Sequence, residues 1–172
     1  MKSIKLVLGI VTLFLITLAI GCSDEDSYSD VHEYIKVVAK ETNYITPAEL
    51  KVKIDSAEVF NLIDVREASE FNFGYIPGAT NIPRGVIEFK INNEEYWENE
   101  GLYLPEKSEL FVLICKKGGR STLAAKAIHK LGYDNVMVLK GGWKNWELTY
   151  PDVFEKNLDA NAHEEEEEVG GC

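Results

Sequence analysis

Short, largely apolar runs recur along the middle of this chain, separated by more polar segments. Runs of this length that end in charged or glycine-rich residues predict buried strands. We expect such strands at residues 59–65, 80–82, 110–115 and 136–139. We expect helices at residues 68–73, 94–99, 121–131 and 143–148. Because strands alternate with helices, the pattern predicts an α/β fold with a central, mostly parallel sheet flanked by helices.

Residues that favour helix ends support this pattern. Thr46 is followed by Pro47, which is the usual order of an N-cap and a first helical residue, so a short helix should begin there. Gly132 follows the predicted 121–131 helix and is placed to end it. Outside its N-terminal segment the chain keeps about 150 residues, enough for one buried core. We therefore predict a single folded domain.

Changes in composition divide the chain into four parts. They are a predicted signal peptide at 1–21, a tether at 22–43, the folded domain at 44–150 and an acidic tail at 151–172. The tail includes consecutive glutamates at 164–168, and we expect it to be disordered because like charges repel one another. The formal net charge of the chain is −11, which opposes binding to nucleic acid.

The N-terminus has the parts of an export signal. Lys2 and Lys5 precede an uncharged stretch at 6–20, which is short for a membrane-spanning helix of about 20 residues. Cysteine directly after Gly21 resembles the lipobox of bacterial lipoproteins, which implies that Cys22 carries lipid. We therefore expect export and a lipid anchor in a bacterial membrane, facing the periplasm or the cell surface. An ordinary signal peptide or an uncleaved anchor is the alternative.

The predicted strand at 110–115 leads into a loop rich in reactive and cationic groups. Its residues are Cys115, Lys116, Lys117, Gly118, Gly119 and Arg120. A helix should start here, and its free N–H groups and positive dipole end favour an anion. The two glycines let backbone amides converge on one point. Together with the three cations, these features should shift a thiol toward the nucleophilic thiolate. We therefore predict that Cys115 is catalytic rather than a small core residue.

The order strand, Cys, four residues, Arg, helix resembles the active-site loop of rhodanese-like sulfurtransferases. Three other segments resemble the same family, namely 61–67 with its Asp64-x-Arg66 ending, the turn at 74–79 and the Gly-Gly-Trp turn within 139–143. The resemblance covers about residues 46–147 and implies a single rhodanese-like domain. Tyr75 stands where the family usually has histidine, and the stretch 84–109 is longer than in compact members.

The resemblance implies a two-step transfer of sulfur. Cys115 would take the outer sulfur of a donor such as thiosulfate and hold it as a persulfide. A thiol or cyanide would then accept that sulfur. The resemblance also implies which residues bind the small anionic donor or stabilise the persulfide, namely Lys116, Lys117, Gly118, Gly119 and Arg120. It implies no metal and no organic cofactor, and the three histidines are scattered along the chain.

Three other functions stay open from the sequence. A rhodanese-like module can bind anions or proteins without catalysis, and a cysteine of this kind can store sulfur as a sensor. The related dual-specificity phosphatases resemble this loop but have one more residue in it. Here four residues separate Cys115 from Arg120, and the shorter ring of amides suits one sulfur better than a tetrahedral phosphate. The loop also lacks an Asp to act as general acid, so we favour sulfur transfer.

Two further segments allow a structural or a functional interpretation. Asp64 and Arg66 end a predicted strand, so they could lie at the mouth of the site. Alternatively they form an ion pair that orders the following turn, which is the interpretation we favour. The Gly141-Gly142-Trp143 segment is expected to be a tight turn that places an indole at the edge of the core.

Overall fold

The computed structural model describes residues 27–157. The predicted signal peptide, the predicted lipidation site Cys22 and the tail beyond Asn157 lie outside the described residues. The chain separates into two compact units, Met1–Val31 and His32–Cys172, and the fold below belongs to the second. Within residues 27–157, no helix is both long enough and apolar enough to cross a membrane.

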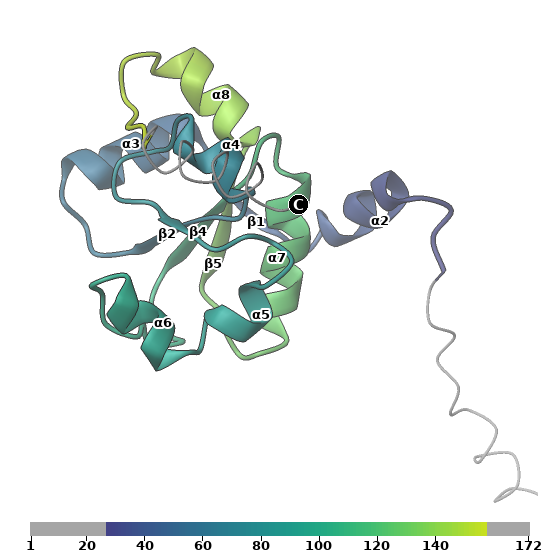
Figure 1. Ribbon diagram of the computed structural model, residues 1–172. Coiled ribbons are helices and arrows are strands. Elements are labelled where there is room, and N and C mark those ends of the chain that lie inside the picture. Colours follow the sequence, from purple (N-terminus) through teal and green to yellow (C-terminus); the bar gives the residue numbers. More distant parts are fainter. Residues whose placement is uncertain (1–26, 158–172) are drawn as a thin grey trace, which may run out of the picture. The chain divides into compact units, whose positions relative to one another are not determined.

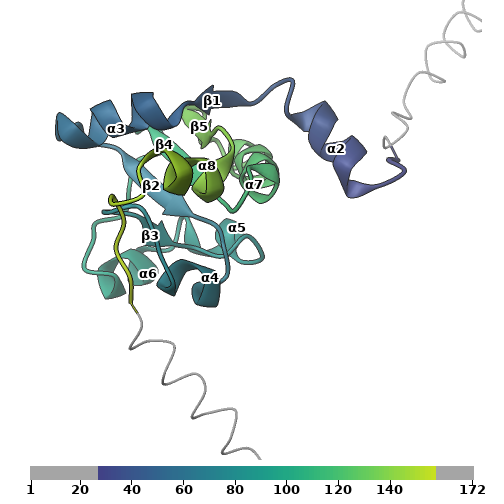
Figure 2. The same ribbon diagram turned by 90° about the horizontal axis from the view of Figure 1, so that it is seen from above.

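A five-stranded sheet forms the centre of the domain, and all its strand pairings are parallel. In spatial order the strands are β1 (Asn43–Ile45), β5 (Val136–Leu139), β4 (Phe111–Ile114), β2 (Asn61–Asp64) and β3 (Thr80–Asn81). Figure 2 shows β1 beside β5 at one edge of the sheet. The predicted α/β class with a mostly parallel sheet is therefore confirmed.

Helices cover both faces of this sheet (Figure 1). Those packed against the sheet are α3 (Pro47–Asp55), α5 (Ile87–Lys90), α6 (Glu94–Asn99), α7 (Gly119–His129) and α8 (Gly142–Thr149). Helix α4 (Ala68–Asn72) follows β2, and α2 (Val31–Val38) lies beside α7, where the Lys126 Nζ is 5.0 Å from the centre of the Tyr34 ring. One buried cluster joins the sheet to α5, α6 and α7, and another joins it to α3 and α8. The layered arrangement follows because each face of a parallel sheet must be covered from water.

The predicted apolar run at 110–115 does not alternate with polar residues, and strand β4 shows the reason. Phe111 and Leu113 belong to the cluster beneath α5, α6 and α7, whereas Val112 and Ile114 belong to the cluster beneath α3 and α8. Side chains alternate between faces along a strand, so a strand buried on both sides is apolar throughout. This strand therefore places the following Cys115 at its carboxyl end, where it is still buried in the cluster beneath α5, α6 and α7.

The helix boundaries agree with the sequence where local chemistry determines them. Thr46 caps α3, and its hydroxyl accepts a hydrogen bond from the Glu49 N–H at 3.2 Å. Strand β5 and helix α6 have the predicted bounds. Helix α7 starts at Gly119 rather than Ser121, because the left-handed Gly118 (φ 105°) ends the loop two residues earlier than expected.

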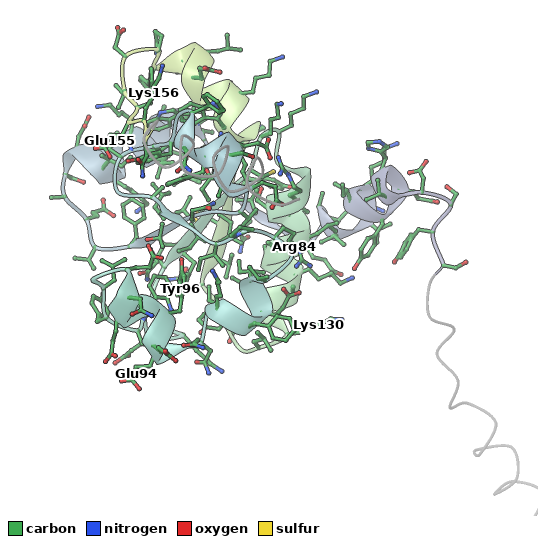
Figure 3. The ribbon with its side chains drawn as sticks, viewed as in Figure 1. Arg84, Glu94, Tyr96, Lys130, Glu155 and Lys156 are labelled. Atoms are coloured by element: carbon green, nitrogen blue, oxygen red, sulfur yellow. The ribbon has the colours of Figure 1, made fainter. Side chains whose placement is uncertain are left out.

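Two elements were not predicted, and each is too short to show a pattern. Strand β1 has only one buried side chain, that of Ile45, so no apolar run marks it. Helix α5 is four residues long and lies in the stretch 84–109, which is longer than in compact members of the family that the sequence resembles. That stretch is anchored by α6, where the Tyr96 hydroxyl donates to the Asn81 carbonyl at 2.9 Å (Figure 3).

Ordered structure also lies on both sides of residues 44–150. The predicted tether contains α2 and the start of β1. At the other end, residues 151–157 pack onto the domain rather than leaving it at residue 150. Glu155 forms an antiparallel bridge with Tyr75, and the Trp146 indole N–H donates to the Val153 carbonyl at 2.8 Å. These contacts close the turn that the sequence places at 74–79.

Candidate functional site

The thiol of Cys115 lies at the carboxyl end of β4, where the loop turns into α7. Its residue is 1% exposed, so the sulfur sits at the edge of the core rather than in free solvent. The Gly118 N–H donates to Sγ at 3.1 Å. Gly118 has a positive φ of 105°, a backbone conformation that a residue with a side chain rarely adopts. The loop thus aims a backbone donor at the sulfur.

A hydroxyl also approaches this sulfur. The Ser121 Oγ lies 3.4 Å from Cys115 Sγ and 2.9 Å from the Gly118 carbonyl oxygen. Its single proton can serve either acceptor, so Ser121 can strengthen its bond to sulfur when negative charge collects there. Ser121 is buried in the first turn of α7. Sequence reasoning treated it only as the start of the helix.

The Gly141-Gly142-Trp143 turn supports the loop that follows β4 through backbone hydrogen bonds. The Trp143 N–H donates to the Cys115 carbonyl at 2.8 Å, and the Lys144 N–H donates to the Lys116 carbonyl at 3.1 Å. A Cβ at Gly142 would lie 2.1 Å from the Cys115 carbonyl oxygen. Only glycine fits at this position, which also has a positive φ of 62°. The turn expected from the sequence is therefore also the support of the cysteine backbone.

Arg120 is already paired in this structure. Its guanidinium donates to the two carboxylate oxygens of Glu70 at 2.5 and 2.9 Å. This bond lowers the pKa of the Glu70 carboxyl and raises that of Arg120. Glu70 lies on α4, fifty residues earlier, and no local sequence pattern connects it to the loop. Arg120 was expected to attract the donor, but its charge is balanced here by Glu70.

The two lysines of the loop differ from Arg120. Lys116 and Lys117 are both exposed, and the structure shows no ion pair between either and another described side chain. They are therefore the cations at the predicted site that a small anion can reach without displacing a carboxylate. The predicted site residues 115–120 lie together where β4 ends and α7 begins. Among their three cations, Arg120 is paired with a carboxylate, whereas Lys116 and Lys117 have no ion pair with another described residue.

Asp64 and Arg66 form the ion pair favoured from the sequence. The Arg66 Nη2 lies 2.6 Å from Asp64 Oδ2, and the two side chains are 3% and 0% exposed. The Arg66 guanidinium also donates to the carbonyls of Glu70 at 3.2 Å and Gly74 at 2.8 Å. Burial raises the pKa of the Asp64 carboxyl, and Arg66 opposes that shift. The pair thus orders the segment that holds Glu70, as the structural interpretation predicted.

A cleft of about 370 Å³ opens beside the loop. It is lined by Arg66, Glu70, Lys116, Trp143, Lys144 and Glu147. The Arg66 guanidinium carbon lies 4.8 Å from the centre of the Trp143 ring, which makes a stacked wall. Two of its lining residues, Trp143 and Lys144, are the ones whose backbone N–H groups donate to the carbonyls of Cys115 and Lys116. Within the described part of the chain, no group of three or more His, Cys, Asp or Glu side chains could hold a metal ion.

Comparison with known proteins agrees with the family that the sequence resembles. Residues 46–149 match the rhodanese-like domain family. The chain is 40% identical over 87 residues to the "Putative thiosulfate sulfurtransferase, mitochondrial" of Schizosaccharomyces pombe, covering 49% of this chain and 61% of that protein. It is 36% identical over 96 residues to the "Putative sulfur carrier protein YrkF" of Bacillus subtilis, covering 56% of this chain and 46% of that protein.

A solved structure supports the same fold. The human single-domain sulfurtransferase TSTD1 superposes with a TM-score of 0.57 at 27% identity, covering 61% of this chain and 95% of that one. The match spans less than two thirds of the length of both curated relatives above. Similar proteins of this kind carry the names of sulfurtransferases or sulfur carriers. With the family match covering more than half of its residues, the chain belongs to the rhodanese-like domain family.

Proposed function

We propose that this protein is a sulfurtransferase that moves sulfane sulfur from a donor such as thiosulfate to a thiophilic acceptor through a persulfide on Cys115. One observation carries the proposal. The Cys115 sulfur is buried at a strand end and receives the Gly118 N–H at 3.1 Å, directly before an eleven-residue helix. Such a cradle stabilises a sulfur anion and suits nucleophilic sulfur chemistry.

In the first step, the Cys115 thiolate attacks the outer sulfur of thiosulfate. A new bond forms between Sγ and that sulfur, the bond from that sulfur to the sulfonate breaks, and sulfite leaves with the electron pair. Lys116 and Lys117 attract the anionic donor to an otherwise acidic protein, and their effect is local because charges are screened beyond about 8–10 Å. Arg120 joins them only when Glu70 gives up part of its pairing.

In the second step, a thiolate or cyanide attacks the outer sulfur of the persulfide. The bond to Cys115 breaks, and Sγ leaves as the thiolate, ready for another donor. The Gly118 amide and the Ser121 hydroxyl face Sγ, so they stabilise its charge as it returns. Neither step requires an oxidant or a reductant.

A phosphatase is the competing catalytic proposal for this fold. The four-residue spacing between Cys115 and Arg120 disfavours it, because the ring of amides is small. A non-catalytic binding module is disfavoured by the presence of the thiol and its backbone donor.

Mass spectrometry of the purified domain after exposure to thiosulfate tests the proposal. We expect one added sulfur atom on Cys115, lost again on addition of cyanide with formation of thiocyanate. The same sample is offered an aryl phosphate in parallel. Turnover of the phosphate without a sulfur adduct would support the phosphatase. The absence of both a sulfur adduct and phosphate turnover would support the binding module.

The location of the protein is a separate proposal that rests on the N-terminal residues alone. We propose that the mature chain starts at Cys22 and is held on a bacterial membrane by lipid. Small residues before Cys22 and the uncharged stretch at 6–20 support it. Cys22→Ala should release the domain to the soluble fraction or leave an unprocessed precursor. Processing and fractionation like the wild type would contradict the lipid anchor and would leave the sulfurtransferase proposal untouched.

A further inference from the structure

The cleft beside the active loop carries charges of both signs that the rest of the fold does not use. Two of its charged residues are engaged, because Arg66 is paired with Asp64 and Glu70 with Arg120. The other three, Lys116, Lys144 and Glu147, are exposed, and the structure shows no ion pair between any of them and another described residue. The cleft thus offers two available cations and one available anion.

Backbone hydrogen bonds link these groups to the residue that carries the reacting sulfur. The Lys144 N–H donates to the Lys116 carbonyl at 3.1 Å, so the two lysines stem from adjoining backbone. Trp143 also lines the cleft, and its backbone N–H donates to the Cys115 carbonyl at 2.8 Å. Glu147 follows Trp143 by one helical turn on α8, on the same side of that helix. The cleft is therefore fixed relative to the Cys115 peptide.

We infer that this cleft is the subsite for the sulfur acceptor, and that it selects a small thiol bearing both an ammonium and a carboxylate group. The inference rests on the proposed sulfurtransferase function. Glu147 would pair with the ammonium group, and Lys144, with Lys116, would pair with the carboxylate. A simple anion uses only the lysines and meets Glu147 unfavourably, whereas an amino-acid-type thiol satisfies both signs. The cleft volume of about 370 Å³ suits a small molecule.

The reaction at this subsite is the second step of the transfer. The bound acceptor loses its thiol proton to solvent and attacks the outer sulfur of the persulfide. A bond forms between the acceptor sulfur and the outer sulfur, and the bond to Cys115 Sγ breaks. The product is the persulfide of the acceptor, and Cys115 returns as the thiolate. Sulfur is transferred as a neutral atom, so no outside oxidant or reductant takes part.

Three acceptors that differ only in their charged groups test the assignment. Cysteine carries both charges, cysteamine lacks the carboxylate and 3-mercaptopropionate lacks the ammonium group. Each variant is first loaded with thiosulfate to full persulfide occupancy, checked by mass spectrometry, and then mixed with a series of acceptor concentrations. The measured quantity is the acceptor concentration at which the rate of persulfide loss is half its maximum. This concentration for each variant is divided by the wild-type value for the same acceptor, which cancels differences in intrinsic thiol reactivity.

Neutralising Glu147 or Lys144 should each weaken the binding of a different pair of acceptors. Glu147→Gln should raise the half-saturating concentration about threefold to fivefold for cysteine and cysteamine, as expected for a partly exposed ion pair, and not for 3-mercaptopropionate. Lys144→Gln should raise it for cysteine and 3-mercaptopropionate, and not for cysteamine. Its backbone N–H bond to Lys116 does not depend on the side chain, so the loop should keep its position.

Matched controls remove the same charges far from the cleft. Glu94→Gln on α6 and Lys130→Gln just after α7 lie well apart from it (Figure 3), and their ratios should stay near one for all three acceptors. Ratios that are equal across acceptors in the cleft variants would overturn the subsite alone. If the wild-type protein forms no persulfide on Cys115, the proposed function fails, and the subsite fails with it.

Discussion

Two neighbouring strands are each followed by an ion pair between an arginine and a carboxylate, and the two pairs differ in their exposure to water. Strands β2 and β4 pair in parallel, with Asp64 opposite Ile114, so their following loops start side by side. Each strand is followed by an arginine that is bound to a carboxylate. After β2, Arg66 and Asp64 are 3% and 0% exposed, whereas after β4, Arg120 at the start of α7 and its partner Glu70 on α4 are 34% and 30% exposed.

The difference in burial separates a structural pair from an adjustable one. Breaking a buried pair leaves a charge without water, which costs several kcal/mol. A pair that water reaches contributes only about 0–1 kcal/mol, so an anion can compete for its arginine. The loop after β2 is therefore built for stability, and the loop after β4 keeps charge that can respond to a ligand. Glu70 connects them, because its carbonyl binds Arg66 and its carboxylate binds Arg120.

The largest effect should come from the nucleophile of the β4 loop. Cys115→Ser should abolish thiosulfate-to-cyanide sulfur transfer, because a hydroxyl cannot form a persulfide. The fold should be retained, since the side chain changes little in size. Thiocyanate formation measures the activity and urea unfolding measures the stability. Residual activity above a tenth of the wild type would contradict the role of Cys115.

Breaking the buried pair of the β2 loop should act on stability instead. Arg66→Met leaves Asp64 buried and unpaired, and should lower the free energy of unfolding by about 3–5 kcal/mol. Arg84→Met is the matched control, because Arg84 pairs with Glu88 at 3.0 Å on the surface, at 29% and 35% exposure. The control should cost at most about 1 kcal/mol. Equal costs in urea unfolding would remove the distinction between buried and exposed pairs.

The support beneath the β4 loop gives a third test. Gly142→Ala places a Cβ 2.1 Å from the Cys115 carbonyl oxygen at a positive φ, so the loop must move. We expect a loss of about 1–3 kcal/mol of stability and a clear loss of sulfur transfer. Gly85→Ala is the control, because nothing lies within 4 Å of its Cβ position. Wild-type activity in the Gly142 variant would show that the turn does not position Cys115.

Removing the unpaired cations of the β4 loop should have a moderate effect confined to the donor. The double variant Lys116→Gln and Lys117→Gln should raise the KM for thiosulfate several-fold and lower kcat less, and should flatten the dependence of the rate on salt. The stability should be unchanged because neither lysine is paired with a described residue. An unchanged KM would mean that the lysines do not attract the donor.

The exposed pair of Arg120 and Glu70 should show a small effect on stability and a definite pH dependence. Arg120 lowers the pKa of the Glu70 carboxyl below its usual 4.5. The pair therefore adds stability above pH 4.5 and loses that contribution as the pH falls through the lowered pKa. Glu70→Gln should remove this acid-dependent part, cost at most about 1 kcal/mol at neutral pH, and lower the KM for thiosulfate by freeing Arg120.

Urea unfolding of the wild type and the Glu70 variant across this pH range measures the difference. The gap between the two proteins should close at acid pH, where the wild-type carboxyl is protonated. A gap that stays constant with pH would show that Glu70 stabilises the fold through its backbone alone. An unchanged KM would show that the donor does not reach Arg120.

Local patterns in the sequence determined the class of fold and the place of the proposed nucleophile. The apolar run before Cys115 marks a strand buried on both faces, and Thr46 with Pro47 marks a helix start, because both depend on neighbouring residues. The composition of the loop from 115 to 120 indicated an anion-binding strand end. The ion pair of Asp64 and Arg66 could also be predicted, since its members are two residues apart.

Only the tertiary structure decided which of these groups are available. It pairs Arg120 with Glu70 across fifty residues, sets Gly142 against the Cys115 carbonyl and gathers Lys116, Lys144 and Glu147 around one cleft. No periodicity or spacing encodes such contacts, because they depend on which strands become neighbours and how the loops at one sheet edge meet. The sequence thus contains the reactive group, and the packing of distant segments decides the charge around it.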